Sequence, residues 1–208
     1  MSVWSDLRIS WQAYKTRRKM NRQFGKREDP FSYTTTPYEA TRLEAMEQAL
    51  GTAALGTALE VGCAEGHFTE RLAKRADRVI ALDISSVALE RARQRAPAAF
   101  LEADLMTWDP GLFAPFDVIV LGDVLYYLDR PGVAEEFGAL FPRVASWLKR
   151  GGRLILAHGY AGEKEFVHRR FFRERFEAAG LKLVSEGPVA GANRGGVRCL
   201  LSVLQKIS

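Results

Sequence analysis

From residue 36 onward, short apolar runs alternate with amphipathic segments, and this alternation constrains the fold more than any other feature of the chain. Helix-like patterns cover residues 36–50, 66–75, 85–95, 133–148 and 166–179, and strand-like runs cover residues 57–61, 78–82, 99–102, 116–121, 153–157, 181–185 and 198–204. Strands that alternate with helices are typical of an α/β protein with a sheet covered on both faces. We therefore predict a seven-stranded, mostly parallel sheet.

Two local sequence signals predict where one helix begins and where another is kinked or split. Thr36, Pro37 and Glu39 have the spacing of a capping box, with proline at the first helical position. Pro142 lies inside the segment 133–148 and is expected to kink or split that helix.

The net charge of +5 is concentrated at the N-terminus. Residues 1–28 contain eight Lys/Arg and two Asp/Glu, a net +6, so the other 22 basic and 23 acidic residues leave −1 on residues 29–208. We divide the chain into a basic, helical N-terminal extension over residues 1–35 and a domain over residues 36–208. The basic segment is either a solvated helix face or a surface for an acidic partner.

The chain carries no signal for secretion, membrane insertion or a structural metal. Its most apolar stretch, residues 116–128, is interrupted by Asp117 and Asp123 and is too short to cross a bilayer. Two cysteines, Cys63 and Cys199, form no disulfide framework and no zinc pattern with the three histidines. We expect a cytoplasmic protein without a membrane partner or a metal.

A glycine-bearing turn follows the first predicted strand. Its sequence, residues 60–68, is Glu-Val-Gly-Cys-Ala-Glu-Gly-His-Phe. Small residues at Gly62, Ala64 and Gly66 let the backbone turn sharply and approach a ligand. A dinucleotide fingerprint requires glycine at positions 64 and 67, where this chain has Ala64 and His67. The turn therefore suits a ligand without a pyrophosphate, and a dinucleotide oxidoreductase is disfavoured.

Carboxylates follow the next three strands. Asp83 lies 21 residues after Gly62, where an acidic side chain can accept both hydroxyls of a ribose. Asp104 ends the third strand and is placed to accept a hydrogen bond from an exocyclic amine of a base. Asp123 ends the fourth. Ligands of open α/β sheets bind beyond the carboxyl ends of the strands, so these side chains are expected to meet.

At these positions the chain resembles the class I S-adenosylmethionine methyltransferases. The resemblance covers about residues 36–206 and includes the turn at 59–66, Asp83, residues 103–105, the end of the fourth strand and residues 148–154. It implies a Rossmann-like fold with strand order 3-2-1-4-5-7-6, the seventh strand antiparallel, and S-adenosylmethionine as cofactor.

Within that class, the chain is similar to the nodulation-factor (NodS-like) N-methyltransferases. The similar stretches are residues 29–39, 60–64, 68–72, 124–128 and 199–201. Members of this group methylate an amino sugar at one end of a chito-oligosaccharide, so the resemblance implies a small-molecule amine as acceptor. The basic N-terminal extension and Asp123 depart from the group. The expected cofactor-binding residues are Tyr38, Glu60, Gly62, Cys63, Ala64, Gly66, Phe68, Asp83, Ile84, Ser85, Asp104, Leu105, Gly122, Asp123 and Val124.

Two side chains are candidates for proton transfer, because an amine or hydroxyl acceptor must lose a proton. Asp123 could accept the proton or bind a substrate ammonium, or it could bond to the cofactor's amine. His158, after the fifth strand, is the better base by its ordinary pKa. Tyr33, Tyr126, Tyr127 and His158 are expected to face the acceptor. Residues 31–38 are expected to close the site as a lid.

Other functions remain open at this point. O-methylation of a phenol or carboxylate would depend more on His158 than on Asp123. A nucleic-acid-binding methyltransferase would use the basic N-terminal segment, although that segment has no RNA-recognition motif and the fourth strand ends in no base-holding sequence. A monomer and a homodimer fit the sequence equally well.

Overall fold

The strands form one sheet in the predicted order. The computed structural model describes residues 3–189, 191–193 and 195–207. Its strands are β1 (Leu55–Val61), β2 (Ala76–Asp83), β3 (Ala99–Glu102), β4 (Phe116–Gly122), β5 (Leu148–Tyr160), β6 (Leu181–Pro188) and β7 (Arg198–Lys206). The order β3-β2-β1-β4-β5-β7-β6, with β7 antiparallel to both neighbours, confirms the predicted sheet.

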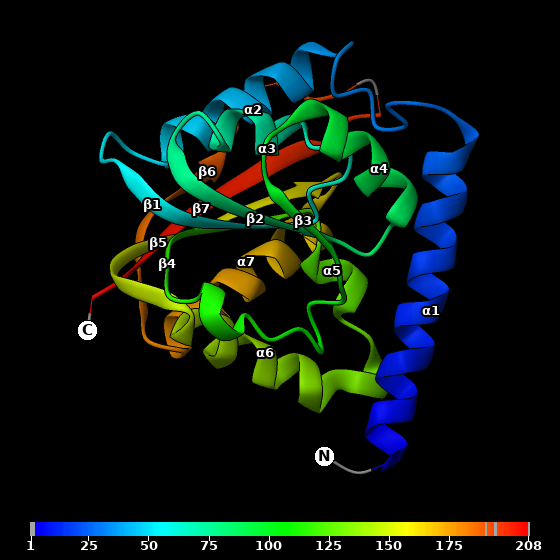
Figure 1. Ribbon diagram of the computed structural model, residues 1–208. Coiled ribbons are helices and arrows are strands. Elements are labelled where there is room, and N and C mark those ends of the chain that lie inside the picture. Colours follow the sequence, from blue (N-terminus) through cyan, green and yellow to red (C-terminus); the bar gives the residue numbers. More distant parts are fainter. Residues whose placement is uncertain (1–2, 190, 194, 208) are drawn as a thin grey trace.

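Helices cover both faces of this sheet (Figure 1). The α-helices are α1 (Val3–Lys26), α2 (Pro37–Ala49), α3 (His67–Leu72), α4 (Ser86–Arg95), α5 (Leu125–Leu128), α6 (Ala134–Ser146) and α7 (Glu163–Ala178), with 3-10 turns η1 (Gly111–Phe113) and η2 (Pro131–Val133). Alternate side chains of β1 enter two different cores: Leu59 packs in the cluster that contains residues of α6 and α7, and Ala58 packs with residues of α2 and α3.

The N-terminal helix α1 bridges the two layers. It contacts α4 on one side of the sheet and η2 on the other, and Figure 1 shows it along one side of the molecule. Ile9, Met20 and Phe24 of α1 are buried. The extension is thus a long helix that packs on the domain, a length that the charge pattern did not indicate.

The capping box predicted at Thr36 and Glu39 forms only in part, and the split predicted as one outcome at Pro142 does not occur. Thr36 caps α2 by accepting from the Glu39 N–H at 3.4 Å, as predicted, but the Glu39 carboxylate pairs with Arg42 at 2.9 Å instead of completing the capping box. A buried guanidinium without a counter-charge costs more free energy than an N–H group left uncapped at the helix end, so Glu39 pairs with Arg42. Helix α6 continues through Pro142 and is not split.

Candidate active site

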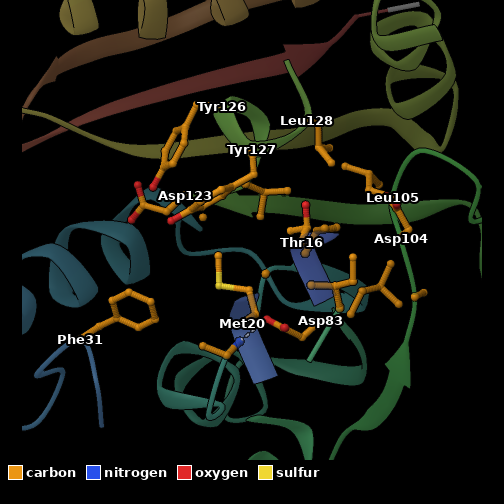
Figure 2. A pocket seen from close by; sticks show the side chains of 18 of the residues that line it. Thr16, Met20, Phe31, Asp83, Asp104, Leu105, Asp123, Tyr126, Tyr127 and Leu128 are labelled. Atoms are coloured by element: carbon orange, nitrogen blue, oxygen red, sulfur yellow. Dashed lines mark hydrogen bonds between the residues drawn. The ribbon is translucent and has the colours of Figure 1, made fainter. Parts of the chain in front are cut away.

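The carboxyl ends of β1, β2, β3 and β4 surround an open cavity, whose empty space is about 900 Å³ when the solvent at its mouth is included. Figure 2 shows Asp83, Asp104 and Asp123 around this space, together with Thr16 and Met20 of α1 and the tyrosines of α5. The lining residues are Thr16, Met20, Phe24, Phe31, Tyr33, Glu39, Val61, Gly62, Ala64, Leu82, Asp83, Ile84, Ala103, Asp104, Leu105, Gly122, Asp123, Val124, Tyr126, Tyr127 and Leu128. The cavity is therefore largely apolar, with carboxylates at three strand ends.

The turn after β1 brings backbone to the cavity floor. Gly62 has φ +80°, and a Cβ built there would lie 2.3 Å from Val124 Cγ2 and 2.8 Å from the Gly122 carbonyl oxygen. The N–H groups of Gly62 and Cys63 both donate to the Leu82 carbonyl, at 2.8 and 3.0 Å. Glycine is required at position 62 because both the left-handed backbone and the contact with the end of β4 exclude a side chain.

We expect Gly62→Ala to lower the free energy of unfolding by at least about 2 kcal/mol, since it adds a left-handed alanine and a clash with Val124. Gly187→Ala is the matched control: nothing lies within 4 Å of its Cβ position, and its effect should be within about 0.5 kcal/mol. Urea denaturation measures both. Equal stability of the two variants would show that the turn tolerates a side chain.

Asp83 is fixed by backbone donors. Its Oδ2 accepts from the Ala64 N–H at 2.9 Å and its Oδ1 from the Ser85 N–H at 2.8 Å. Burial raises the pKa of Asp83 above its ordinary value, although these N–H groups act in the opposite direction. The carboxylate joins the turn after β1 to the start of α4 and keeps free lone pairs at the cavity.

Asp104 is held in a similar way, because its Oδ1 accepts from the Met106 N–H at 2.9 Å. Burial raises its pKa as well.

Asp123 belongs to a buried charge network. Its Oδ2 is 2.7 Å from Arg42 Nη2, and its Oδ1 accepts from the Gly159 N–H at 2.6 Å. Arg42 also pairs with Glu39 and is only 3% exposed. Burial raises the pKa of Asp123, but Arg42, His158 and the bonds from Gly159 and Tyr126 outweigh it and hold that pKa below its ordinary value. Asp123 therefore stays ionised at the edge of the cavity.

The wall formed by α5 is fixed from both sides. Gln12 of α1 donates from Nε2 to the carbonyls of Tyr127 and Leu128, at 3.3 and 3.1 Å. On the other side, the Arg169 guanidinium lies 4.2 Å from the centre of the Tyr126 ring. His168 of α7 contacts Phe172 and also pairs with Asp129 at 2.6 Å. These contacts set the position of the tyrosines in the cavity.

His158 does not reach the cavity, contrary to the expectation that it faces the acceptor. It is 2% exposed, its ring packs against Tyr126 and Phe172, and its Nε2 has no hydrogen-bond partner in the described part of the chain. Burial is the main cause that lowers the pKa of His158 to about 3. The strand continues beyond His158 to Tyr160, and the His158 side chain packs against Phe172 of α7, so the geometry does not support a role as base.

The buried His158 makes a pH-dependent contribution to stability. Its ordinary pKa is 6.5 and its pKa in the folded protein is about 3, so between these values the unfolded chain binds a proton that the folded chain does not. Stability is then lost as the pH falls below 6.5, by about 1.4 kcal/mol per pH unit.

We expect His158→Phe to remove this slope, which urea denaturation at a series of mildly acidic pH values would measure as the difference between variant and wild type. Taking the difference cancels Glu60, whose burial raises its pKa to about 7 and whose slope has the opposite sign. An unchanged slope would mean that His158 is protonated in the folded protein.

The predicted site residues divide into two groups. Those that line the cavity are Tyr33, Gly62, Ala64, Asp83, Ile84, Asp104, Leu105, Gly122, Asp123, Val124, Tyr126 and Tyr127. Those that do not line it are Tyr38, Glu60, Cys63, Gly66, Phe68, Ser85 and His158. In the second group, Ser85 caps α4 and Tyr38 packs in the core. Glu60, Cys63 and Phe68 line a smaller cavity that shares Gly62 and Gly122 with the first, and the Glu60 carboxylate accepts from Thr69.

Sequence reasoning missed the contribution of α1 and the charge network. Thr16, Met20 and Phe24 line the cavity, and their spacing of four residues was the available signal for one helix face. Arg42 gave no comparable signal, because a single arginine in an amphipathic helix is ordinarily a surface residue.

Three potential metal ligands, Asp29, Glu65 and His67, come within 4.8 Å of one another. Protein groups already use their oxygens: Glu65 pairs with Arg91 and accepts from the Asp29 N–H, and the Asp29 carboxylate accepts from Thr34. The cluster is therefore part of the packing between the N-terminal segment and α3.

Comparison with known proteins identifies the family. Residues 14–170 match the family model described as nodulation protein S, NodS. The chain belongs to the NodS family. Nodulation protein S of Azorhizobium caulinodans is 31% identical over 131 residues, 61% of either chain. Its counterpart in Rhizobium tropici is 32% identical over 133 residues, 62% of this chain and 54% of the relative. The matches thus span less than two thirds of these relatives.

A solved NodS structure has the same fold. The N-methyltransferase NodS from Bradyrhizobium japonicum WM9, crystallised with S-adenosyl-L-homocysteine, superposes with a TM-score of 0.79 over 93% of this chain and 99% of that chain, at 24% identity. The NodS fold therefore extends over nearly all of this chain, and the family match, which begins at residue 14, includes the C-terminal half of α1.

Proposed function

We propose that this protein is an S-adenosylmethionine-dependent methyltransferase that methylates the amine of a small molecule, an amino sugar or a related natural product. The observation that carries the proposal is the cavity with Asp83, Asp104 and Asp123 at successive strand ends beside the Gly62 turn. Membership of the NodS family and the bound S-adenosyl-L-homocysteine of the Bradyrhizobium protein support it.

The donors and acceptors of the cavity fit this cofactor. Asp83 has lone pairs for both ribose hydroxyls, and Asp104 can accept from the adenine amine. Gly62 and Gly122 also line a smaller cavity of about 300 Å³, together with Arg42 and Glu60. Both terminal nitrogens of Arg42 already pair with carboxylates, but its Nε has no partner in the described part of the chain and is left to donate to the carboxylate of the amino-acid end. The cofactor supplies a methyl group on a sulfonium; the protein aligns the acceptor and excludes water.

The acceptor side favours an amine. Asp123 is ionised, and its low pKa makes it a weak base but a good partner for a cationic or N–H donor. Tyr33, Tyr126 and Tyr127 provide aromatic faces around it. In this role Asp123 would accept a hydrogen bond from the neutral amine and direct the nitrogen lone pair toward the methyl group; the methylated ammonium product would carry the proton and lose it to solvent after release. O-methylation, which depended on His158, is not favoured because that ring lies outside the cavity.

We propose that the methyl group is accepted by a small molecule and that the protein acts as a monomer or homodimer. Cys63 and Cys199 are free and buried, which agrees with action in the cytoplasm.

Two measurements test the function. Calorimetry should detect binding of S-adenosyl-L-homocysteine and none of NAD. A mass-based assay with methyl-labelled S-adenosylmethionine should then find a methylated product among amino sugars, including chito-oligosaccharides with a free terminal amine, and not among phenols. Binding of NAD alone, or methylation of phenols only, would refute the proposal.

The N-terminal segment is proposed as the lid of the site. We expect Phe31→Ala to raise the dissociation constant for S-adenosyl-L-homocysteine about tenfold, because Phe31 lines the cavity and its ring packs edge-on against Phe24 and Tyr33. Phe171→Ala on α7, with a ring about as exposed as that of Phe31, serves as control in the same calorimetric titration. Equal affinities of both variants would rule out the lid.

A further inference from the structure

The outer face of α1 carries three exposed apolar side chains. Leu7, Trp11 and Tyr14 are 56%, 60% and 48% exposed, and their spacing of four and three residues places them on one stripe of the helix. In Figure 1 no other element of the described chain lies on the side of α1 that faces away from the sheet. The opposite side of the helix is anchored by the buried Ile9, Met20 and Phe24. The three exposed apolar side chains therefore contribute little to the packing of α1 on the domain.

Basic side chains lie beside this stripe and beyond its C-terminal end. Those that are exposed along the described part of α1 are Arg8, Lys15, Arg18, Lys19, Arg22 and Lys26. The acidic residues of the first 28 positions are only Asp6 and Glu28, one near each end of the segment. The net charge of this segment is +6 against −1 for the rest of the chain, so the positive potential is concentrated on one helix.

We propose that the outer face of α1 docks on an anionic lipid surface, with the helix lying in the plane of the headgroups. The exposed Trp, Tyr and Leu side chains can enter the boundary between headgroups and acyl chains. The Lys and Arg side chains of the same helix can bind the anionic headgroups. The segment bears enough basic side chains for electrostatic binding to anionic lipids, at about 1 kcal/mol per charge near the surface.

A nucleic acid fits the same face less well. The Trp11 and Tyr14 rings stack on each other, with centroids 5.7 Å apart, and the Lys15 ammonium lies 5.5 Å from the centre of the Trp11 ring. These ring faces are already partly covered, whereas single-strand binding relies on open faces for the bases.

Docking of this kind departs from the expectation of no membrane partner. That expectation considered only segments that cross a bilayer, and indeed none of the described helices has the length and apolarity to span one. A peripheral helix needs neither property.

Co-sedimentation of the full chain with vesicles tests the proposal without using catalysis. The protein should bind vesicles of phosphatidylcholine with phosphatidylglycerol and not vesicles of phosphatidylcholine alone. Arg18→Glu with Arg22→Glu should weaken binding at least about tenfold. Trp11→Ser should weaken it about fivefold, since it removes apolar burial. The control, Lys164→Glu with Lys182→Glu, reverses two exposed charges on α7 and β6 and should leave binding unchanged.

Calorimetry with S-adenosyl-L-homocysteine should give the same affinity for all these variants, so failure of docking and failure of the proposed function are distinguishable. Absence of binding to anionic vesicles, or equal losses in the control, would overturn the proposal. Binding to single-stranded DNA that exceeds vesicle binding and does not depend on Trp11 would also overturn it and assign the face to a polyanion.

Discussion

Asp123→Asn should lower kcat/KM for an amine acceptor about 100-fold while affinity for S-adenosyl-L-homocysteine stays the same. The substitution keeps the size of the side chain and removes its charge, and its amide nitrogen then faces either Arg42 or the Gly159 N–H, which donate to the two oxygens of Asp123. The acceptor amine then loses the carboxylate that holds its N–H and directs its lone pair. Steady-state kinetics with a chito-oligosaccharide bearing a terminal amine, combined with calorimetry, measures both quantities.

The control is Asp117→Asn at the other end of β4. Asp117 accepts from the Thr57 N–H and pairs with Lys149, so its neutralisation also removes an ion pair but lies far from the cavity. Activity of this variant should match the wild type. If Asp123→Asn instead weakens binding of S-adenosyl-L-homocysteine and leaves turnover intact, Asp123 binds the cofactor's amine and not the acceptor.

Asp83→Asn should raise the dissociation constant for S-adenosyl-L-homocysteine about 10- to 100-fold, because each hydrogen bond to a charged group contributes about 1.5–3 kcal/mol. The two oxygens of Asp83 accept from two backbone N–H groups, of Ala64 and Ser85. An asparagine can satisfy only one of them, and its amide would face the other donor. Loss of the ribose contact and displacement of the turn therefore both lower the affinity for S-adenosyl-L-homocysteine. The calorimetric titration measures their combined effect.

Asp77→Asn tests whether any aspartate of β2 gives this effect. Asp77 is exposed near the start of the same strand, and its neutralisation should leave the affinity unchanged. An unaltered dissociation constant for Asp83→Asn would remove ribose recognition from the proposed role of this side chain.

The sequence predicted the sheet and the three carboxylates for a physical reason. Parallel strands end at one edge, so residues that directly follow the strands, such as Asp83, Asp104 and Asp123, must converge once the strand order is right. The order itself came from family likeness, since many orders satisfy the same hydrophobic pattern.

The side chains that were misplaced or missed depend on tertiary packing. The predicted strand ended before His158, but β5 continues to Tyr160 and pairs His158 with Leu200 of β7, so the direction of the ring is set by this pairing and by α7. The role of Arg42 depends on its ion pair with Asp123, which lies 81 residues later in the chain. The local sequence pattern predicts neither the direction of the His158 ring nor this pairing.

The position of α1 has a consequence for the order in which the protein assembles. The helix is synthesised first, yet Gln12 bonds to Tyr127 and Leu128, more than 100 residues later in the chain. Its complete docking must therefore wait until β4 and α5 exist. Contacts that close such long loops form slowly. The cofactor cavity is thus completed by a helix whose hydrogen-bond partners lie more than 100 residues later in the chain, and we expect this helix to undock more readily than the strands of the sheet separate.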